Sequence, residues 1–247
     1  MGKTVAEKKG TEVGAVIDYE QFAGAGLENA EAEDYAIPFI YIVQKNSKVI
    51  DTDEDAKPGM FFNNVTGELY KELLAIPCEF EKEYVEWVPH DDGGGYKGRH
   101  DWDSGILDQC NQDDRGKWFL ENGHQIVDTR KHYVLIINPE TGEIFPALIT
   151  MTSTQAKKSR RWLSTMGNRL IELTSGKKIQ APTFAYMYRL STVQESKDKN
   201  TWYGWVVQKM KDANDGKIMD EGLFLQAYEL HKSIKLGDVK EASPEQE

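Results

Sequence analysis

A basic stretch with a tryptophan at its centre, residues 152–169, is the part of this sequence best suited to bind a charged ligand. It reads TSTQAKKSRRWLSTMGNR, and it contains Lys157, Lys158, Arg160, Arg161, Trp162 and Arg169. The stretch contains no acidic residue, although the whole chain carries a formal net charge of −11. Lys and Arg neutralise phosphates, and an indole ring can stack on an unpaired base. The stretch therefore predicts a phosphate-binding surface, and a solvated basic helix face is the alternative.

The same stretch has the pattern of a helix. Thr152 and Gln155 have the spacing of a capping box, which predicts that a helix begins here. Apolar residues then recur at helical spacing, at Ala156, Leu163, Met166, Leu170 and Leu173. We expect one long helix that buries this stripe, projects its Lys and Arg side chains into solvent and ends near Gly176.

Basic and aromatic residues continue beyond this helix. Between Thr154 and Leu190 there are eight basic side chains against Glu172 alone, a sum of +7. A Gly- and Asp-rich loop, residues 90–105, adds further aromatic and basic side chains and is expected to be mobile. The predicted nucleic-acid contacts are Lys157, Lys158, Arg160, Arg161, Trp162, Arg169, Lys177, Lys178, Tyr96, Arg99, Trp102, Tyr186, Arg189 and Trp202. A core position is the alternative for the strand aromatics among them.

Residues that could support catalysis or hold a metal form no strong motif. Cys78, His90, His100 and Cys110 are separated by gaps wider than a zinc finger or knuckle uses. The acidic residues between Asp91 and Asp108 could chelate Mg²⁺ in a nuclease, but acidic residues in Gly-rich loops are more often solvated. The sequence has no nucleophile elbow and no phosphate-binding glycine loop. It therefore predicts no catalytic residue, no metal and no cofactor, with a Mg²⁺-dependent nuclease as the enzymatic alternative.

The cysteine count and the absence of long apolar segments indicate the cellular compartment of the protein. Two cysteines without CxxC spacing exclude a disulfide scaffold. The sequence has no signal-peptide pattern and no apolar run of about 18 residues, so we expect a cytoplasmic protein that has no contact with a membrane.

The rest of the chain has mostly the sequence pattern of β-strands. Residues 73–88 alternate over a length that requires the strand to curve or bulge, with Ile76, Cys78 and Phe80 on one face. Asn122-Gly123 predicts a tight hairpin. Further strands are expected at 131–138, 144–151, 184–190 and 202–210, and a last helix at 222–234. The pattern predicts a mainly β protein, an OB-like Greek-key antiparallel barrel with one long basic helix and a C-terminal helix, with a β-sandwich as the alternative.

The domain organisation follows from the ends of the chain. Residues 1–34 are expected to form a flexible acidic N-terminal arm, and residues 35–235 a single OB-like nucleic-acid-binding domain. Residues 236–247 are expected to form a disordered acidic C-terminal tail.

Several segments together carry a family resemblance. PGMFFNNVTGELY, IPCEFEKEYVEWVP, the GGGYKG loop and HYVLIINPETGEIFPALITMTSTQAKKSRRW resemble bacteriophage single-stranded DNA-binding replication proteins of OB-fold type, over residues 37–210. The resemblance implies a sequence-tolerant binder that protects unpaired strands during replication and recombination in the host cytoplasm, with residues 157–162 in contact with DNA. It implies no catalytic residues.

Other partners follow less directly from the sequence. The acidic tail could recruit replication proteins, although it lacks the terminal aromatic residue of well-known phage relatives. A homo-oligomer is left open. A phage structural protein or a protein that interacts with a host factor is the remaining alternative.

Overall fold

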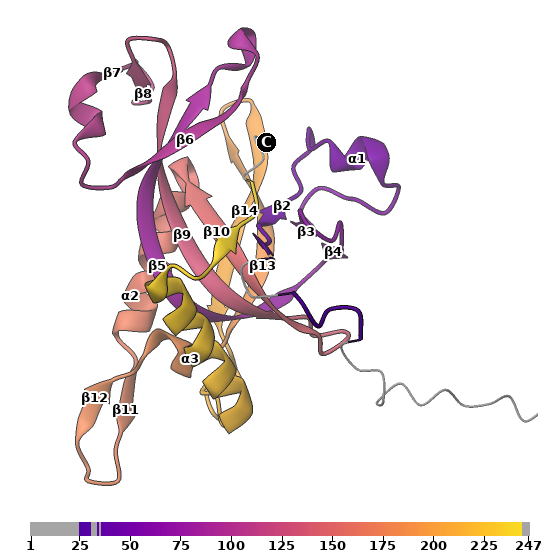
Figure 1. The fold of residues 1–247 in the computed structure, drawn as a ribbon, viewed down its shortest axis with the longest axis vertical. Helices are drawn as coiled ribbons and strands as arrows, with labels where there is room; N and C mark the ends of the chain where they lie inside the picture. Colours follow the sequence, from indigo (N-terminus) through magenta and orange to yellow (C-terminus); the bar gives the residue numbers. More distant parts are fainter. Residues whose placement is uncertain (1–24, 31–33, 35, 244–247) are drawn as a thin grey trace, which may run out of the picture.

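The main feature of the fold is one curled antiparallel sheet with few helices (Figure 1). The computed structural model describes residues 25–30, 34 and 36–243. The strands of the main sheet are β5 (Leu73–Val88), β6 (Gly95–Asp101), β7 (Cys110–Gln112), β8 (Trp118–Leu120), β9 (Gln125–Ile137), β10 (Ile144–Thr152), β13 (Tyr188–Lys197) and β14 (Asn200–Lys209). The short strands outside it are β1 (Ala36–Ile37), β2 (Ile40–Ile42), β3 (Phe61–Asn63), β4 (Leu69–Tyr70), β11 (Leu170–Glu172), β12 (Lys178–Gln180) and β15 (Lys240–Glu241). The helices are α1 (Val49–Thr52), α2 (Ala156–Gly167) and α3 (Glu221–Leu236).

The long pair β5 and β9 runs through the whole sheet. Their antiparallel pairing extends from Leu74 opposite Ile137 to Trp87 opposite Gln125, with a register shift between Pro77 and Glu79. At one end, β13 and β14 extend the sheet beyond β5, and β10 pairs with β9. At the other end, β6 pairs with β5, and β8 and β7 follow β9. The predicted irregularity of the long strand is confirmed, and it lets the sheet bend.

The sheet curls until its edges β10 and β14 approach a common neighbour, β2. The backbone N–H of Leu148 on β10 donates to the carbonyl of Pro38, just before β2, at 2.8 Å. After β2, the side-chain amide of Gln44 donates to the carbonyl of Tyr203 on β14 at 3.0 Å and accepts from its N–H at 2.8 Å. The mainly β fold class is confirmed, and the arrangement is consistent with an OB-like barrel with helical additions.

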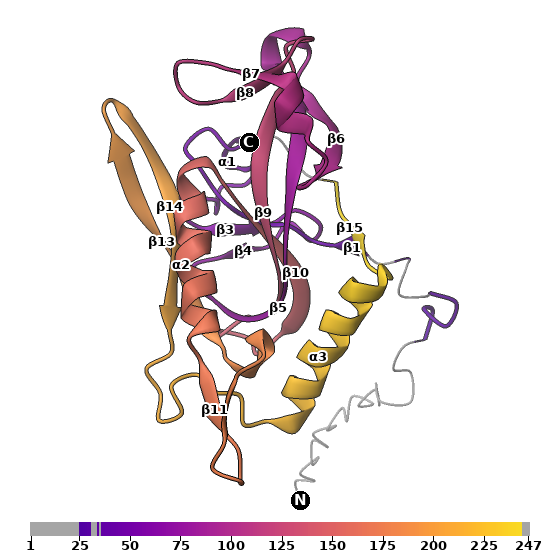
Figure 2. The same ribbon diagram turned by 90° about the vertical axis from the view of Figure 1, so that its left-hand side faces the viewer.

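Each face of the sheet is covered by one long helix. On β9, Val134 and Ile136 belong to the core beneath α2, whereas Tyr133 and Leu135 belong to the core beneath α3. This alternation is the ordinary consequence of a strand with two buried faces. In Figure 2, α2 and α3 lie on opposite sides of β9 and β10.

The predicted long helix is corrected by the structure. It begins at Ala156 after a 3₁₀ turn, and α2 ends at Gly167. The chain then forms the β11–β12 hairpin, in which Leu170 pairs with Gln180, so Leu170 and Leu173 lie exposed on a projecting arm. Gly has a low helix propensity, and the hairpin satisfies the backbone instead. The buried side chains of α2 are Ala156, Ser159, Trp162 and Met166.

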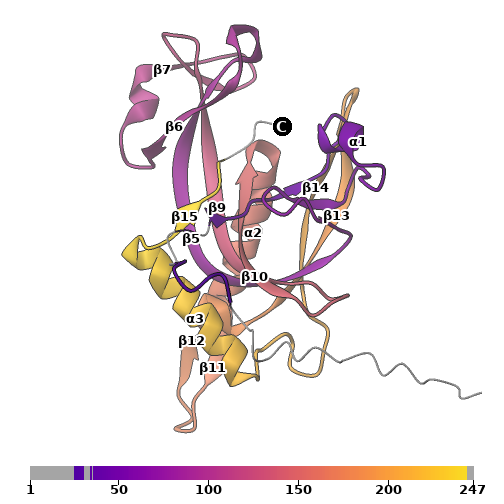
Figure 3. The same cartoon turned by 45° about the vertical axis from the view of Figure 1, so that its right-hand side comes forward.

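Two segments expected to lack structure belong to sheets. Part of the predicted Gly-rich loop forms β6, which pairs with β5 from Val88 opposite Gly95 to Glu83 opposite Asp101. Within the predicted C-terminal tail, β15 pairs in parallel with β1 and lies across the main sheet beside α3 (Figure 3). Most of the predicted N-terminal arm, residues 1–24 and 31–33, lies outside the described residues.

A buried ion pair explains the order of the tail segment. The Glu241 carboxylate is 2.5 Å from Lys131 Nζ and 3.0 Å from Arg99 Nη1, and it also accepts a hydrogen bond from the Tyr133 hydroxyl. Burial raises the pKa of Glu241, but these three donors outweigh it and hold the pKa below its usual value. The acidic residue is therefore a structural anchor on the sheet.

Gly204 on β14 tests the contact between the start of α2 and the sheet edge. A Cβ there would lie 2.6 Å from Glu195 Oε2 and 2.9 Å from the Gln155 side chain. We expect Gly204→Ala to displace both side chains and lower the free energy of unfolding by about 1–2 kcal/mol in urea denaturation. Gly98→Ala is the matched control, because no heavy atom lies within 4 Å of its added Cβ. Equal effects of the two substitutions would contradict this packing.

Candidate nucleic-acid interface

Helix α2 presents three different faces, because residues three and four apart lie on the same side of a helix. Ser159 and Trp162 face the sheet, where the Ser159 hydroxyl is 2.8 Å from His132 Nε2 and the indole stacks on the His132 ring at 4.6 Å between centroids. Trp162 is only 2% exposed. The prediction that its ring stacks on bases is therefore wrong, since the ring is committed to the core.

The cations of α2 occupy the other two faces. Lys157, Arg160 and Arg161 are exposed, as the sequence predicts. Lys158 is half-buried and forms an ion pair with Glu195 on β13 at 2.8 Å. Lys158, Arg161 and Thr165 form the stripe that turns toward strand β14.

A groove of about 610 Å³ separates this stripe from β14. In Figure 2, α2 runs beside β14. Its walls carry the cations Lys158, Arg161, Lys209 and Lys211 against one carboxylate, Asp215. Val206, Val207 and Met210 provide apolar surface between them. The groove is thus a locally basic, partly apolar channel on an acidic protein.

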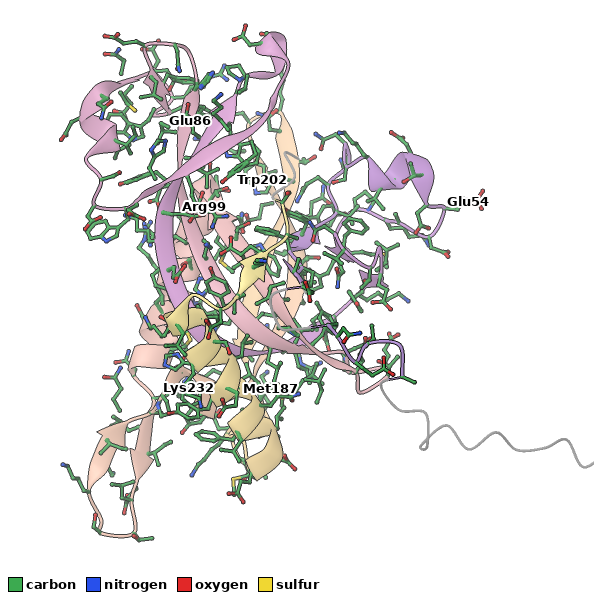
Figure 4. All side chains as sticks on the ribbon, in the orientation of Figure 1. Glu54, Glu86, Arg99, Met187, Trp202 and Lys232 are labelled. Atoms are coloured by element: carbon green, nitrogen blue, oxygen red, sulfur yellow. The ribbon has the colours of Figure 1, made fainter. Side chains whose placement is uncertain are left out.

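Glu195 joins the start of α2 to the aromatic residues of β14. Its carboxylate accepts from the Gln155 amide and the Trp202 indole, each at 3.0 Å, besides pairing with Lys158. Burial raises the pKa of Glu195, but hydrogen bonds from Lys158, Gln155 and Trp202 lower it further than burial raises it. Trp202, labelled in Figure 4, is partly exposed and shares the Glu195 carboxylate with Lys158 of α2, although it is not among the residues that line the groove.

Three predicted contacts lie outside the groove because the core or an ion pair holds their side chains. Arg169 is 8% exposed, pairs with Asp215 and lies 4.3 Å above the ring of Tyr186. Tyr186 is likewise buried, at 8% exposure. Arg189 on β13, also among the predicted contacts, pairs with Glu72 just before the neighbouring strand β5. None of these three lines the groove.

The remaining predicted contacts lie on other elements. Lys177 and Lys178 are exposed on the β11–β12 hairpin. Tyr96 and Arg99 belong to β6, and Trp102 follows it with 58% exposure (Figure 4 labels Arg99). The hollow at Trp102 also contains Glu81, Glu83 and Asp101 with Lys82, so its charge does not favour phosphate. The structure does not bring these residues into the groove.

Sequence reasoning missed two cations of the groove, Lys209 and Lys211. They follow the apolar run of the last strand, where a Lys-x-Lys pattern usually indicates a solvated strand end. The signal that could have found them is the position of β14 as an edge strand next to the basic helix, and that position depends on tertiary structure.

Among the described residues, no group of three His, Cys, Asp or Glu side chains could hold a metal ion. His100 and His124 instead flank the Glu86 carboxylate at 2.9 and 2.5 Å, and this contact ties β6 and the β8–β9 turn to β5. In the same part of the chain, no helix has the length and apolarity required to cross a membrane.

Comparison with known proteins assigns the family. A family model described as Pam3 phage gp34-like protein matches residues 6–240. The chain belongs to this family of phage proteins. The resemblance to bacteriophage proteins is confirmed at this level, whereas single-stranded DNA binding stays a prediction. Searches of curated proteins and of solved structures each give no match.

The buried His132 beneath α2 makes the stability of the gp34-like chain depend on pH. Burial, with a smaller contribution from Arg130, lowers the pKa of His132 to about 3. Below about pH 6.5 the unfolded chain binds a proton that the native state does not, so the free energy of unfolding falls as the pH drops from 6.5 toward 3, by up to about 1.4 kcal/mol per pH unit.

His132→Phe keeps a ring of similar size and removes this titration. Urea denaturation from pH 7 to pH 4.5 should therefore show the variant losing less stability than the wild type. Parallel pH profiles for the two proteins would mean that His132 is not held neutral in the core.

Proposed function

We propose that this gp34-like protein binds single-stranded DNA, with little sequence dependence, in the groove between α2 and β14. The observation that carries the proposal is the groove itself. Four cations and an apolar wall lie together there on a chain whose formal net charge is −11. Cations positioned along a groove neutralise phosphates, and apolar or aromatic surface accepts unpaired bases.

The edge of β14 adds donors to the groove. The backbone N–H groups of Tyr203 and Trp205 point outward from the sheet, since they donate to the side chains of Gln44 and Gln155. By the two-residue alternation of a strand, the N–H and C=O groups of Val207 and Lys209, two residues that line the groove, point to the same side of β14. Backbone N–H groups of this kind commonly hold phosphate oxygens.

We assign base stacking to Trp202, itself a predicted contact, in place of the buried Trp162. Trp202 is partly exposed beside Lys158, and Glu195 fixes its indole through Nε1, so its ring is oriented without being buried. A base stacked on such a ring contributes roughly 1–3 kcal/mol. The exposed cations Lys157 and Arg160 extend the basic surface along α2.

The proposed role is protection of unpaired strands during phage DNA replication and recombination in the host cytoplasm, without catalysis. Recruitment of replication proteins through the acidic C-terminal segment is part of this proposal. Because Glu241 is anchored on the sheet, residues after it would carry that recruitment.

The direct test is fluorescence anisotropy of a labelled oligo(dT) strand, repeated over a salt series with a duplex control. We expect tight binding of the single strand, weaker binding of the duplex and a linear loss of log affinity with log salt. Arg161→Ala combined with Lys209→Ala should weaken binding about tenfold or more and reduce the salt slope by about 2.

The matched control is Lys232→Ala combined with Lys235→Ala, which removes the same charge from α3 on the opposite face of the sheet. If both double variants weaken binding equally, net charge rather than the groove attracts the strand. If the wild type binds no nucleic acid at low salt, the proposal is wrong, and a structural or host-interaction role for this phage protein replaces it.

A substitution of Glu195 is expected to strengthen DNA binding, whereas the substitutions above weaken it. Glu195→Gln removes a negative charge from the edge of the groove and releases Lys158 from its ion pair. We expect oligo(dT) to bind several-fold more tightly to this variant at low salt, with a gain that disappears as salt rises. Glu121→Gln, on the exposed β8–β9 turn, should leave the affinity almost unchanged. Weaker binding by Glu195→Gln at every salt concentration would contradict a phosphate beside Lys158.

A further inference from the structure

Two buried hydrogen-bond donors without acceptors lie among the residues that line the groove, on Trp162 and Tyr188, and we call this part of the lining the floor. Among the described residues, neither Trp162 Nε1 nor Tyr188 Oη finds an acceptor for its hydrogen, although the Tyr188 oxygen lies within reach of the Arg169 guanidinium as a donor. Trp162 and Tyr188 both line the groove, at 2% and 1% exposure, with their rings edge to face at 5.8 Å between centroids. Buried donors are nearly always satisfied in folded proteins, so a cluster of unsatisfied ones in a groove indicates a missing acceptor.

The charge of the floor determines which acceptor fits. The guanidinium of Arg169 lies near the Tyr188 hydroxyl, but Asp215 already neutralises it through an ion pair and a 3.1 Å hydrogen bond to its backbone carbonyl. The Asp215 carboxylate also lines the groove. A phosphate placed at this floor would meet no unpaired cation. The cations at the rim of the groove, Arg161, Lys209 and Lys211, remain available for phosphates. The floor therefore suits a neutral acceptor.

The protonation state agrees with this assignment. Burial raises the pKa of Tyr188, and the nearby Arg169 only partly opposes the effect. The hydroxyl is thus protonated at neutral pH and can donate, as the indole N–H always does. A volume of about 610 Å³ falls within the roughly 300–1,000 Å³ of small-molecule sites, so one nucleotide can be accommodated.

We propose that the floor of the groove is a nucleobase subsite, in which the Trp162 N–H and the Tyr188 O–H donate to a carbonyl oxygen of the base, as thymine, guanine and cytosine present. The inference rests on the proposed single-stranded DNA binding and gives it a base preference. Adenine has no carbonyl oxygen and binds the subsite more weakly. The apolar side chains of β14 contact the faces of the base, and the rim cations hold the flanking phosphates.

Homopolymer binding tests the subsite. The affinities of oligo(dT) and oligo(dA) of equal length are measured for the wild type, Trp162→Phe and Tyr188→Phe. Self-stacking of oligo(dA) is a property of the free strand, so it cancels when the dT-to-dA affinity ratio of each variant is divided by that of the wild type. We expect the ratio to fall about 3- to 10-fold in each variant, the effect of one lost hydrogen bond.

Thermal unfolding separates this role from a structural one. Since each substitution removes an unsatisfied buried donor, Tyr188→Phe should unfold at a temperature equal to or above that of the wild type. A large decrease would mean that the hydroxyl is already bonded inside the protein and would overturn the subsite.

The two proposals fail in different ways. If the variants bind oligo(dT) and keep the wild-type dT-to-dA ratio, the subsite is wrong, while single-stranded DNA binding stands. If the wild type binds none of the homopolymers at low salt, both proposals are overturned.

Discussion

The pairing of β5 with β9 is the interaction on which the rest of the structure depends. It provides one continuous surface with two buried faces, and the register shift between Pro77 and Glu79 lets that surface curl. One face holds α2 through Trp162, His132 and Ser159, and the other holds α3 and the anchored Glu241. Because α2 must bury a stripe on this curled sheet, its remaining faces are turned toward β14 and toward solvent. The groove follows from that geometry.

The electrostatics of the groove depend on the same packing. An acidic chain can bind a polyanion only where its cations are collected and its carboxylates are kept away or paired. Here the cations of α2 and of the end of β14 meet across the groove. Glu195 and Asp215 pair with Lys158 and Arg169. The rim therefore carries a net positive charge, and the floor is close to neutral. This division separates phosphate contacts from contacts to a base.

Part of this account could be predicted from the sequence. The mainly β class, the long β5 strand, the hairpin at Asn122-Gly123 and the C-terminal helix follow from periodicity and turn chemistry, which are local properties. Which face of α2 is buried could not be predicted in the same way. Trp162 is followed by Leu163 and surrounded by charge, so its burial depends on which face meets His132. The stop at Gly167, the pairing of β6 and the role of Lys209 also depend on partners distant in sequence.

The central claim is that a single strand lies between α2 and β14. It is tested most directly by photocrosslinking an oligo(dT) that contains one 4-thiothymidine, followed by mass-spectrometric mapping of the crosslinked peptides. The account predicts crosslinks within residues 157–165 and 202–211, with fewer at high salt. Crosslinks confined to α3 or to the strand β6 region, with none along the groove, would contradict it.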